Sequence, residues 1–313
     1  MKSLRPHQRL IIYLLLSLAL TCVISPWMAL GADWVAARWP TLLSERVPFS
    51  RIFNRAFMIA AIILFVAGRR LLIPDQLKRI LVLRFSAAAK NVLLGCALAL
   101  MSIVLLVAAM TLADVYTPFF RLSLAKSLSR FASALSAGVF AGFMEEVFFR
   151  GILFLSLRDQ GRPARAYILA NLFYSLLHFV KPGNNYYLDQ IDPLAGFRHL
   201  LTTFAPFLDP MPLLPGIVGL FLIGVVLSYA LARTGNLYFS IGLHAGWIIG
   251  LKTIRVFGDF TRQQLGWVFG STDPKIVSGV VTWIGILLVG LTVHWLTRHD
   301  SRLLADRRAG ATA

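Results

Sequence analysis

Charged residues are scarce in this sequence. They make up only 14% of its 313 residues, whereas a soluble domain carries about 25%. Hydrophobic residues reach 58%, and several apolar stretches run to about 20 residues, the helix length that crosses roughly 30 Å of hydrocarbon. The composition therefore excludes an ordinary soluble domain and predicts a protein embedded in a bilayer.

Cysteine is nearly absent. Only Cys22 and Cys96 are present, each inside an apolar run. This excludes a disulfide framework and a cysteine-based zinc site. A compact His-Glu-x-x-His zinc motif is also missing.

The apolar stretches lack the alternation of barrel strands, so we predict that they are helices. The fold class is an all-α integral membrane protein, a polytopic bundle of about eight transmembrane helices. The predicted spans are residues 10–31, 52–73, 91–113, 131–157, 164–181, 215–232, 237–256 and 276–297. The first could instead be a signal peptide, but its apolar run exceeds the usual length of about 7–15 residues, which favours an anchor. The proline-containing connection 182–214 is predicted to be an irregular loop or cap.

Acidic residues are few, 14 against 31 Lys and Arg, which gives a net charge of +17. The basic residues lie between and beside the apolar segments, so we predict contact with anionic lipid headgroups and no nucleic acid. Basic clusters follow the second, fourth and last spans, on the same side as the basic N-terminus. With eight spans, both termini are predicted to be cytoplasmic, in a bacterial plasma membrane. Residues 76–85 suit a helix in the headgroup plane or a plain loop.

Ionisable residues inside predicted spans are costly and therefore mark candidate functional positions. In the fourth span, Glu146 and Arg150 are four residues apart, on one helical face, and can neutralise each other. We interpret this pair as an element of helix packing. Glu145 points about 100° away, has Phe148 and Phe149 at i+3 and i+4, and is left to face another helix.

Two histidines lie in other spans, His178 in the fifth and His244 in the seventh. With Glu145 they form a set from three helices that could activate water and donate hydrogen bonds to an oxyanion. The same three side chains could instead bind zinc. No cofactor is predicted, and zinc stays open.

Small residues favour a close approach of the fourth and seventh spans. They are Ala137, Gly138, Ala141 and Gly142 in the fourth span and Gly242, Ala245 and Gly246 in the seventh.

With these residues, the chain resembles the CAAX prenyl protease and bacteriocin-processing family of intramembrane peptidases. The family pattern is Glu-Glu-x-x-x-Arg, then Phe-x-x-x-His, then a His followed four residues later by Asn. The first element is complete in Glu145, Glu146 and Arg150. The second has Tyr174 in place of Phe before His178, and the third has Ile248 in place of Asn after His244.

The resemblance implies that Glu145 and His178 activate the attacking water and that His244 stabilises the oxyanion. Glu146, Arg150 and Tyr174 are implied as supporting residues. The implied substrate is a membrane-bound protein or lipidated peptide. Domains follow as residues 1–130, N-terminal helices without assignment; 131–250, the peptidase core; and 251–313, a loop, the last span and a basic tail.

Two other functions remain open from the residues. One is a non-catalytic immunity or scaffold protein on the same fold, which Ile248 favours because isoleucine offers no hydrogen bond to an oxyanion. The other is a proton-coupled transporter, which would use Glu and His as relays. The absence of an internal repeat weighs against the transporter.

Overall fold

The computed structural model describes residues 4–39, 41, 46–72, 77, 80–81, 83–180, 186–188, 190, 192–261, 266–270 and 276–298. The chain divides into two compact units. Unit 1 comprises Met1–Pro74 and Leu176–Leu213, and unit 2 comprises Asp75–Ser175 and Leu214–Ala313. Each unit is described by itself.

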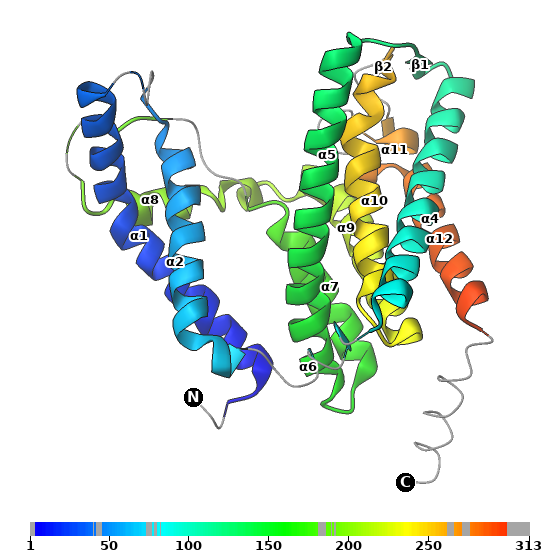
Figure 1. The fold of residues 1–313 in the computed structure, drawn as a ribbon, viewed down its shortest axis with the longest axis horizontal. Helices are drawn as coiled ribbons and strands as arrows, with labels where there is room; N and C mark the ends of the chain where they lie inside the picture. Colours follow the sequence, from blue (N-terminus) through cyan, green and yellow to red (C-terminus); the bar gives the residue numbers. More distant parts are fainter. Residues whose placement is uncertain are drawn as a thin grey trace. The chain divides into compact units, whose positions relative to one another are not determined.

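Unit 1 is built on two long helices, α1 (Pro6–Arg38) and α2 (Phe49–Leu72), which pack along each other (Figure 1). The short helix α8 (Ala195–Thr202) packs on α1, and the 3₁₀ turns η2 (Ala205–Leu208) and η3 (Met211–Leu213) follow it. Gly196 permits this packing, because a Cβ there would lie 2.1 Å from the carbonyl oxygen of Cys22. The predicted irregular connection 182–214 therefore contains a helix, although residues 181–185 lie outside the described part.

Unit 2 contains the remaining elements. They are α4 (Phe85–Leu112), β1 (Tyr116–Pro118), α5 (Leu124–Glu145), η1 (Glu146–Phe154), α6 (Leu155–Arg158), α7 (Pro163–Leu177), α9 (Leu214–Thr234), α10 (Tyr238–Thr253), η4 (Ile254–Val256), β2 (Gly258–Phe260), α11 (Gly266–Phe269), η5 (Ile276–Ser278) and α12 (Val280–Thr297). The last two residues of α7 belong to unit 1. A two-stranded antiparallel pair, β1 with β2, joins the loops after α4 and α10, with Tyr116 opposite Phe260.

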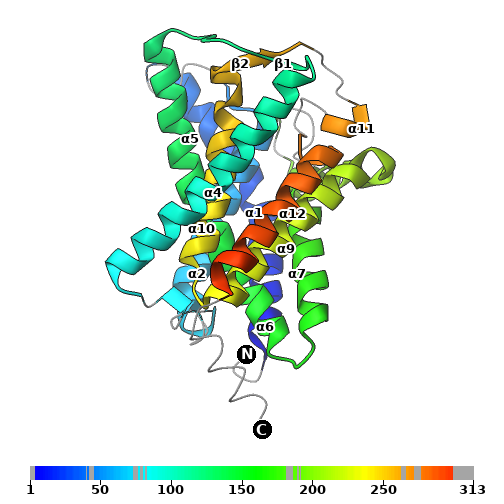
Figure 2. The same ribbon diagram turned by 90° about the vertical axis from the view of Figure 1, so that its right-hand side faces the viewer.

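Helix α10 is the centre of unit 2. It packs against α4 on one side and α5 on the other (Figures 1 and 2). A Cβ on Gly138 of α5 would lie 2.9 Å from the carbonyl oxygen of Ala245, so this glycine lets α5 approach α10 as predicted. The glycines of α10 itself face α4 instead. A Cβ on Gly242 would lie 2.1 Å from the carbonyl oxygen of Val92, so the predicted pairing of Gly242 and Gly246 with the fourth span was wrong.

The protein is a helical membrane protein, and a helix overlaps each of the eight predicted spans. Among the described residues, five helices are long and apolar enough to cross a membrane. They are α1, residues 49–68 of α2, α4, residues 211–234 (η3 followed by α9) and α12. The other three fall short for separate reasons. Helix α5 is long enough but is less apolar, because it contains serines together with Lys126, Arg130 and Glu145, and α7 and α10 have only 15 and 16 residues. The count of eight spans is therefore not confirmed.

The predicted headgroup-plane helix at 76–85 is described only in part, because residues 76, 78, 79 and 82 lie outside the described residues. The basic tail after residue 298 lies outside them altogether.

Candidate active site

The candidate site lies where α5 continues into the π-helix η1, against α10. The predicted fourth span is not a uniform α-helix, because residues 146–154 form i→i+5 turns. Glu145 ends α5 and Glu146 begins η1. A Cβ on Gly142, one turn before Glu145, would lie 3.1 Å from the backbone nitrogen of Ala245. The two helices are therefore in close contact at this point, and both carboxyl groups lie near α10.

Glu146 forms the predicted ion pair with Arg150. Its Oε1 lies 3.0 Å from Arg150 Nη1, and both side chains are fully buried. Arg150 also approaches the carbonyl oxygen of Gly224 in α9, with Nη2 at 3.5 Å. A buried arginine needs such partners, since losing one of them would leave a charge without compensation.

The same oxygen of Glu146 accepts a second contact that the sequence did not predict. His244 Nδ1 lies 2.8 Å from Glu146 Oε1, and the histidine is 4% exposed. No spacing rule could have found this contact, because the two residues are 98 positions apart and lie on different helices. Glu146 thus does more than pair with Arg150.

Glu145 faces His244 from the other side of the ring. Its Oε2 lies 3.7 Å from His244 Nε2, which confirms that this carboxylate faces another helix. The distance exceeds that of a hydrogen bond, but contacts of this kind often tighten only when substrate binds. The Glu145 side chain is 32% exposed, in contrast to 0% for Glu146. Of the two adjacent acids, Glu145 is therefore the one that water or a substrate can reach.

Tyr174 of α7 completes the buried wall of the site. The Arg150 guanidinium lies over its ring, 4.3 Å from the centroid, and the His244 ring lies edge-on at 6.1 Å. Phe149 packs against the same tyrosine at 5.0 Å. An aromatic ring at position 174 therefore contributes a cation–π contact to the arginine that holds Glu146.

The predicted span 164–181 placed His178 inside a helix, and this prediction was wrong. Helix α7 ends at Leu177, and His178 lies exposed in the turn that follows. This turn belongs to unit 1, whereas Glu145, Glu146 and His244 belong to unit 2. The site described above therefore consists of unit 2 residues, and the role of His178 stays a prediction.

Ile248 lies on α10 one turn after His244 and is partly buried. Its side chain has no hydrogen-bonding group, so it adds no oxyanion donor to the histidine. As for metal, the described residues contain no group of three or more His, Cys, Asp or Glu side chains arranged to hold an ion. Because His178 belongs to unit 1 and Glu145 and His244 belong to unit 2, the possible zinc set of these three residues stays a prediction, and we derive no step through a metal.

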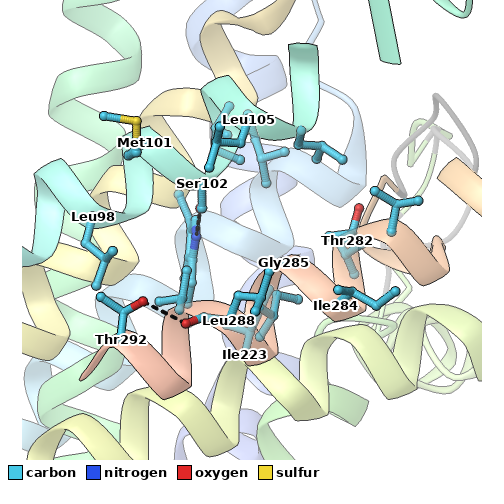
Figure 3. Close-up of a pocket in the computed structure, with 18 residues that line it drawn as sticks. Leu98, Met101, Ser102, Leu105, Ile223, Thr282, Ile284, Gly285, Leu288 and Thr292 are labelled. Atoms are coloured by element: carbon cyan, nitrogen blue, oxygen red, sulfur yellow. Dashed lines mark hydrogen bonds between the residues drawn. The ribbon is translucent and has the colours of Figure 1, made fainter. Parts of the chain in front are cut away.

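A separate apolar cavity of about 280 Å³ lies among α4, α9, α10 and α12 (Figure 3). Trp247 of α10 lines it and donates a hydrogen bond from Nε1 to Ser102 Oγ of α4, at 3.0 Å. None of the residues that line this cavity belongs to the glutamate and histidine cluster. The cavity is a feature of helix packing beside the site and was not predicted.

These observations define a class of protein: a helical membrane protein with a buried cluster of carboxylates, arginine and histidine on adjoining helices. Residues 127–249, which contain the whole cluster, match the family model of the type II CAAX prenyl endopeptidase, Rce1-like. This match, over residues 127–249, confirms the predicted resemblance to the CAAX protease family. No curated protein and no solved structure matches the chain.

Proposed function

We propose that the protein is an intramembrane endopeptidase in which Glu145 activates the attacking water. The observation that carries the proposal is the position of the Glu145 carboxylate. It is partly exposed and faces His244 Nε2 at 3.7 Å, within the segment that matches an endopeptidase family. A carboxylate beside an imidazole, with access for water, is a suitable arrangement for general base catalysis.

In this proposal, Glu145 takes a proton from water, and the remaining hydroxide attacks the carbonyl carbon of the scissile peptide bond. The negative charge that develops on the carbonyl oxygen is stabilised by His244 from Nε2 once that nitrogen carries a proton. A hydrogen-bond donor to an oxyanion lowers the barrier by about 3–4 kcal/mol in other hydrolases. When the tetrahedral intermediate collapses, the C–N bond breaks and the proton taken from water passes to the leaving amine. His178 assists Glu145 in activating water, as the motif implies. Arg150 and Tyr174 hold the buried side of the cluster.

The substrate proposed is a membrane-associated protein, which reaches the site from the bilayer or its surface. The name of the matching family points to CAAX prenyl proteins, and we propose a protein with a lipidated or hydrophobic C-terminal segment. We also propose that catalysis needs no metal ion. Both ring nitrogens of His244 already face carboxylates, Nδ1 toward Glu146 and Nε2 toward Glu145.

The first test compares protein termini in membranes from cells that carry either the native chain or Glu145→Gln. Glutamine keeps the shape of glutamate but cannot take the proton from water. We expect neo-termini found with the native chain to be lost in the variant, while both proteins insert and accumulate equally. The matched control is Asp209→Asn, the same carboxylate-to-amide change at an exposed loop position.

The control should leave the termini unchanged. Identical termini for the native chain and Glu145→Gln would exclude catalysis by Glu145 and would leave a binding role for the same fold.

A further inference from the structure

One oxygen of Glu146 has two partners. Its Oε1 lies 3.0 Å from Arg150 Nη1 and 2.8 Å from His244 Nδ1. Glu146 and Arg150 are fully buried and His244 is 4% exposed, so water does not compete for these contacts. The ion pair on η1 is thereby joined directly to the histidine on α10.

The identity of these partners fixes where the hydrogen lies. Arginine is always charged, and a carboxylate paired with it has acceptor sites only. The hydrogen in the 2.8 Å contact must therefore be on His244 Nδ1, which donates it to Glu146. The second ring nitrogen, Nε2, is the one that faces Glu145. A hydrogen bond to one ring nitrogen sets the tautomer and the orientation of the whole ring.

We propose that Glu146 is the positioning residue of the site, and that it holds His244 as the Nδ1–H form with Nε2 directed at Glu145. Its part in catalysis rests on the proposed peptidase function, but its effect on the tautomer does not. Arg150 in turn keeps the Glu146 carboxylate in place. Glu146 therefore affects the reaction by orienting His244. If Glu146 only stabilised the helix, its role would be limited to the ion pair with Arg150.

This assignment has a consequence for His244. With the ring hydrogen on Nδ1, Nε2 of the neutral imidazole accepts a hydrogen bond and cannot donate one. It can donate to an oxyanion only after it gains a second proton. In the proposed reaction the proton that water loses is the available source, and Nε2 lies beside the carboxylate that takes it. His244 then becomes a donor when the negative charge on the carbonyl oxygen forms.

The test reads the tautomer directly by NMR of ¹⁵N-labelled histidine in bilayers, with His244→Phe used to assign the signals. In the native protein we expect Nδ1 of His244 to carry the hydrogen. Two variants separate the possible roles of Glu146. Arg150→Met breaks the ion pair and keeps the carboxylate, while Glu146→Met with Arg150→Met removes both buried charges together, a change that proteins can tolerate. Glu146→Gln is less informative, since an amide can still accept or donate.

We expect Arg150→Met to keep the Nδ1–H signature and the double variant to lose it, with the hydrogen moving to Nε2, which faces Glu145. The proposal is overturned if the native ring carries its hydrogen on Nε2, or if the double variant keeps it on Nδ1. Loss of the native near-UV circular dichroism marks a variant that has not folded. In that case the shorter acid in Glu146→Asp replaces the double variant, with the same expectation of a lost signature.

Cleavage is measured on the same samples. We expect the double variant to lose much more activity than Arg150→Met, and equal losses would contradict a positioning role. The proposed function fails separately, through unchanged termini in Glu145→Gln, and that result would leave the tautomer measurement intact.

Discussion

Neighbouring positions in this chain carry different chemistry because helical geometry turns them in different directions. Glu145 and Glu146 are adjacent, yet one is 32% exposed and the other fully buried. The sequence was sufficient to separate these two acids and to pair Glu146 with Arg150, because both inferences follow from helical spacing. The hydrogen bond from His244 to Glu146 joins distant segments, and local spacing cannot reveal such a contact.

Position 248 offers a test of the oxyanion site at the level of one residue. Ile248→Asn would place an amide donor one turn after His244, at the position where the CAAX protease family pattern has asparagine. We expect cleavage to rise at least several-fold, because one donor of this kind can contribute about 10²–10³ in rate. The measurement is the initial rate of neo-terminus formation in membranes.

Ile248→Leu is the matched control and should leave the rate near that of the native chain. A rate with asparagine no higher than with leucine would show that His244 does not need a second donor from this position.

The elements follow the sequence closely in their location and less closely in their ends and type. Helix α7 ends at Leu177, although the predicted span continues to residue 181. The π-helix η1 had no visible signal in the sequence. The strands β1 and β2 have three residues each, too few for a recognisable alternation.

Packing of α10 against α4 can be tested by adding a single methyl group. In Gly242→Ala the new Cβ would meet the carbonyl oxygen of Val92 at 2.1 Å, so the helices would have to separate. Overpacking of this kind costs about 1–3 kcal/mol. We expect a lower thermal unfolding midpoint in detergent.

The control is Gly285→Ala in α12, where a Cβ meets nothing within 4 Å. This variant should unfold at or above the native midpoint. A Gly242→Ala midpoint equal to that of the control would show that α4 and α10 are not in tight contact in the membrane.

At the scale of the whole molecule, the number of spans determines the topology. Eight spans place both termini on the same side, and an odd number places them on opposite sides. The basic clusters between spans predict that this side is the cytoplasm. We expect tags at the two ends to be reached by a soluble probe only after cells are permeabilised.

If one tag is labelled in intact cells, the span count is odd. Candidates for the missing crossing are then α7 and α10, whose 15 and 16 residues are short for a bilayer of about 30 Å. Length and hydropathy could not decide this point from the sequence, because short buried helices and true spans share the same apolar composition.

The pairing of Glu146 with Arg150 also matters while the chain is being made. Glu146 precedes His244 by 98 positions, so the histidine is synthesised well after the glutamate. The arginine four positions away is synthesised almost at once and can compensate the buried carboxylate within its own helix. The segment thus carries its own counter-ion, and the histidine joins a pair whose charges already compensate each other.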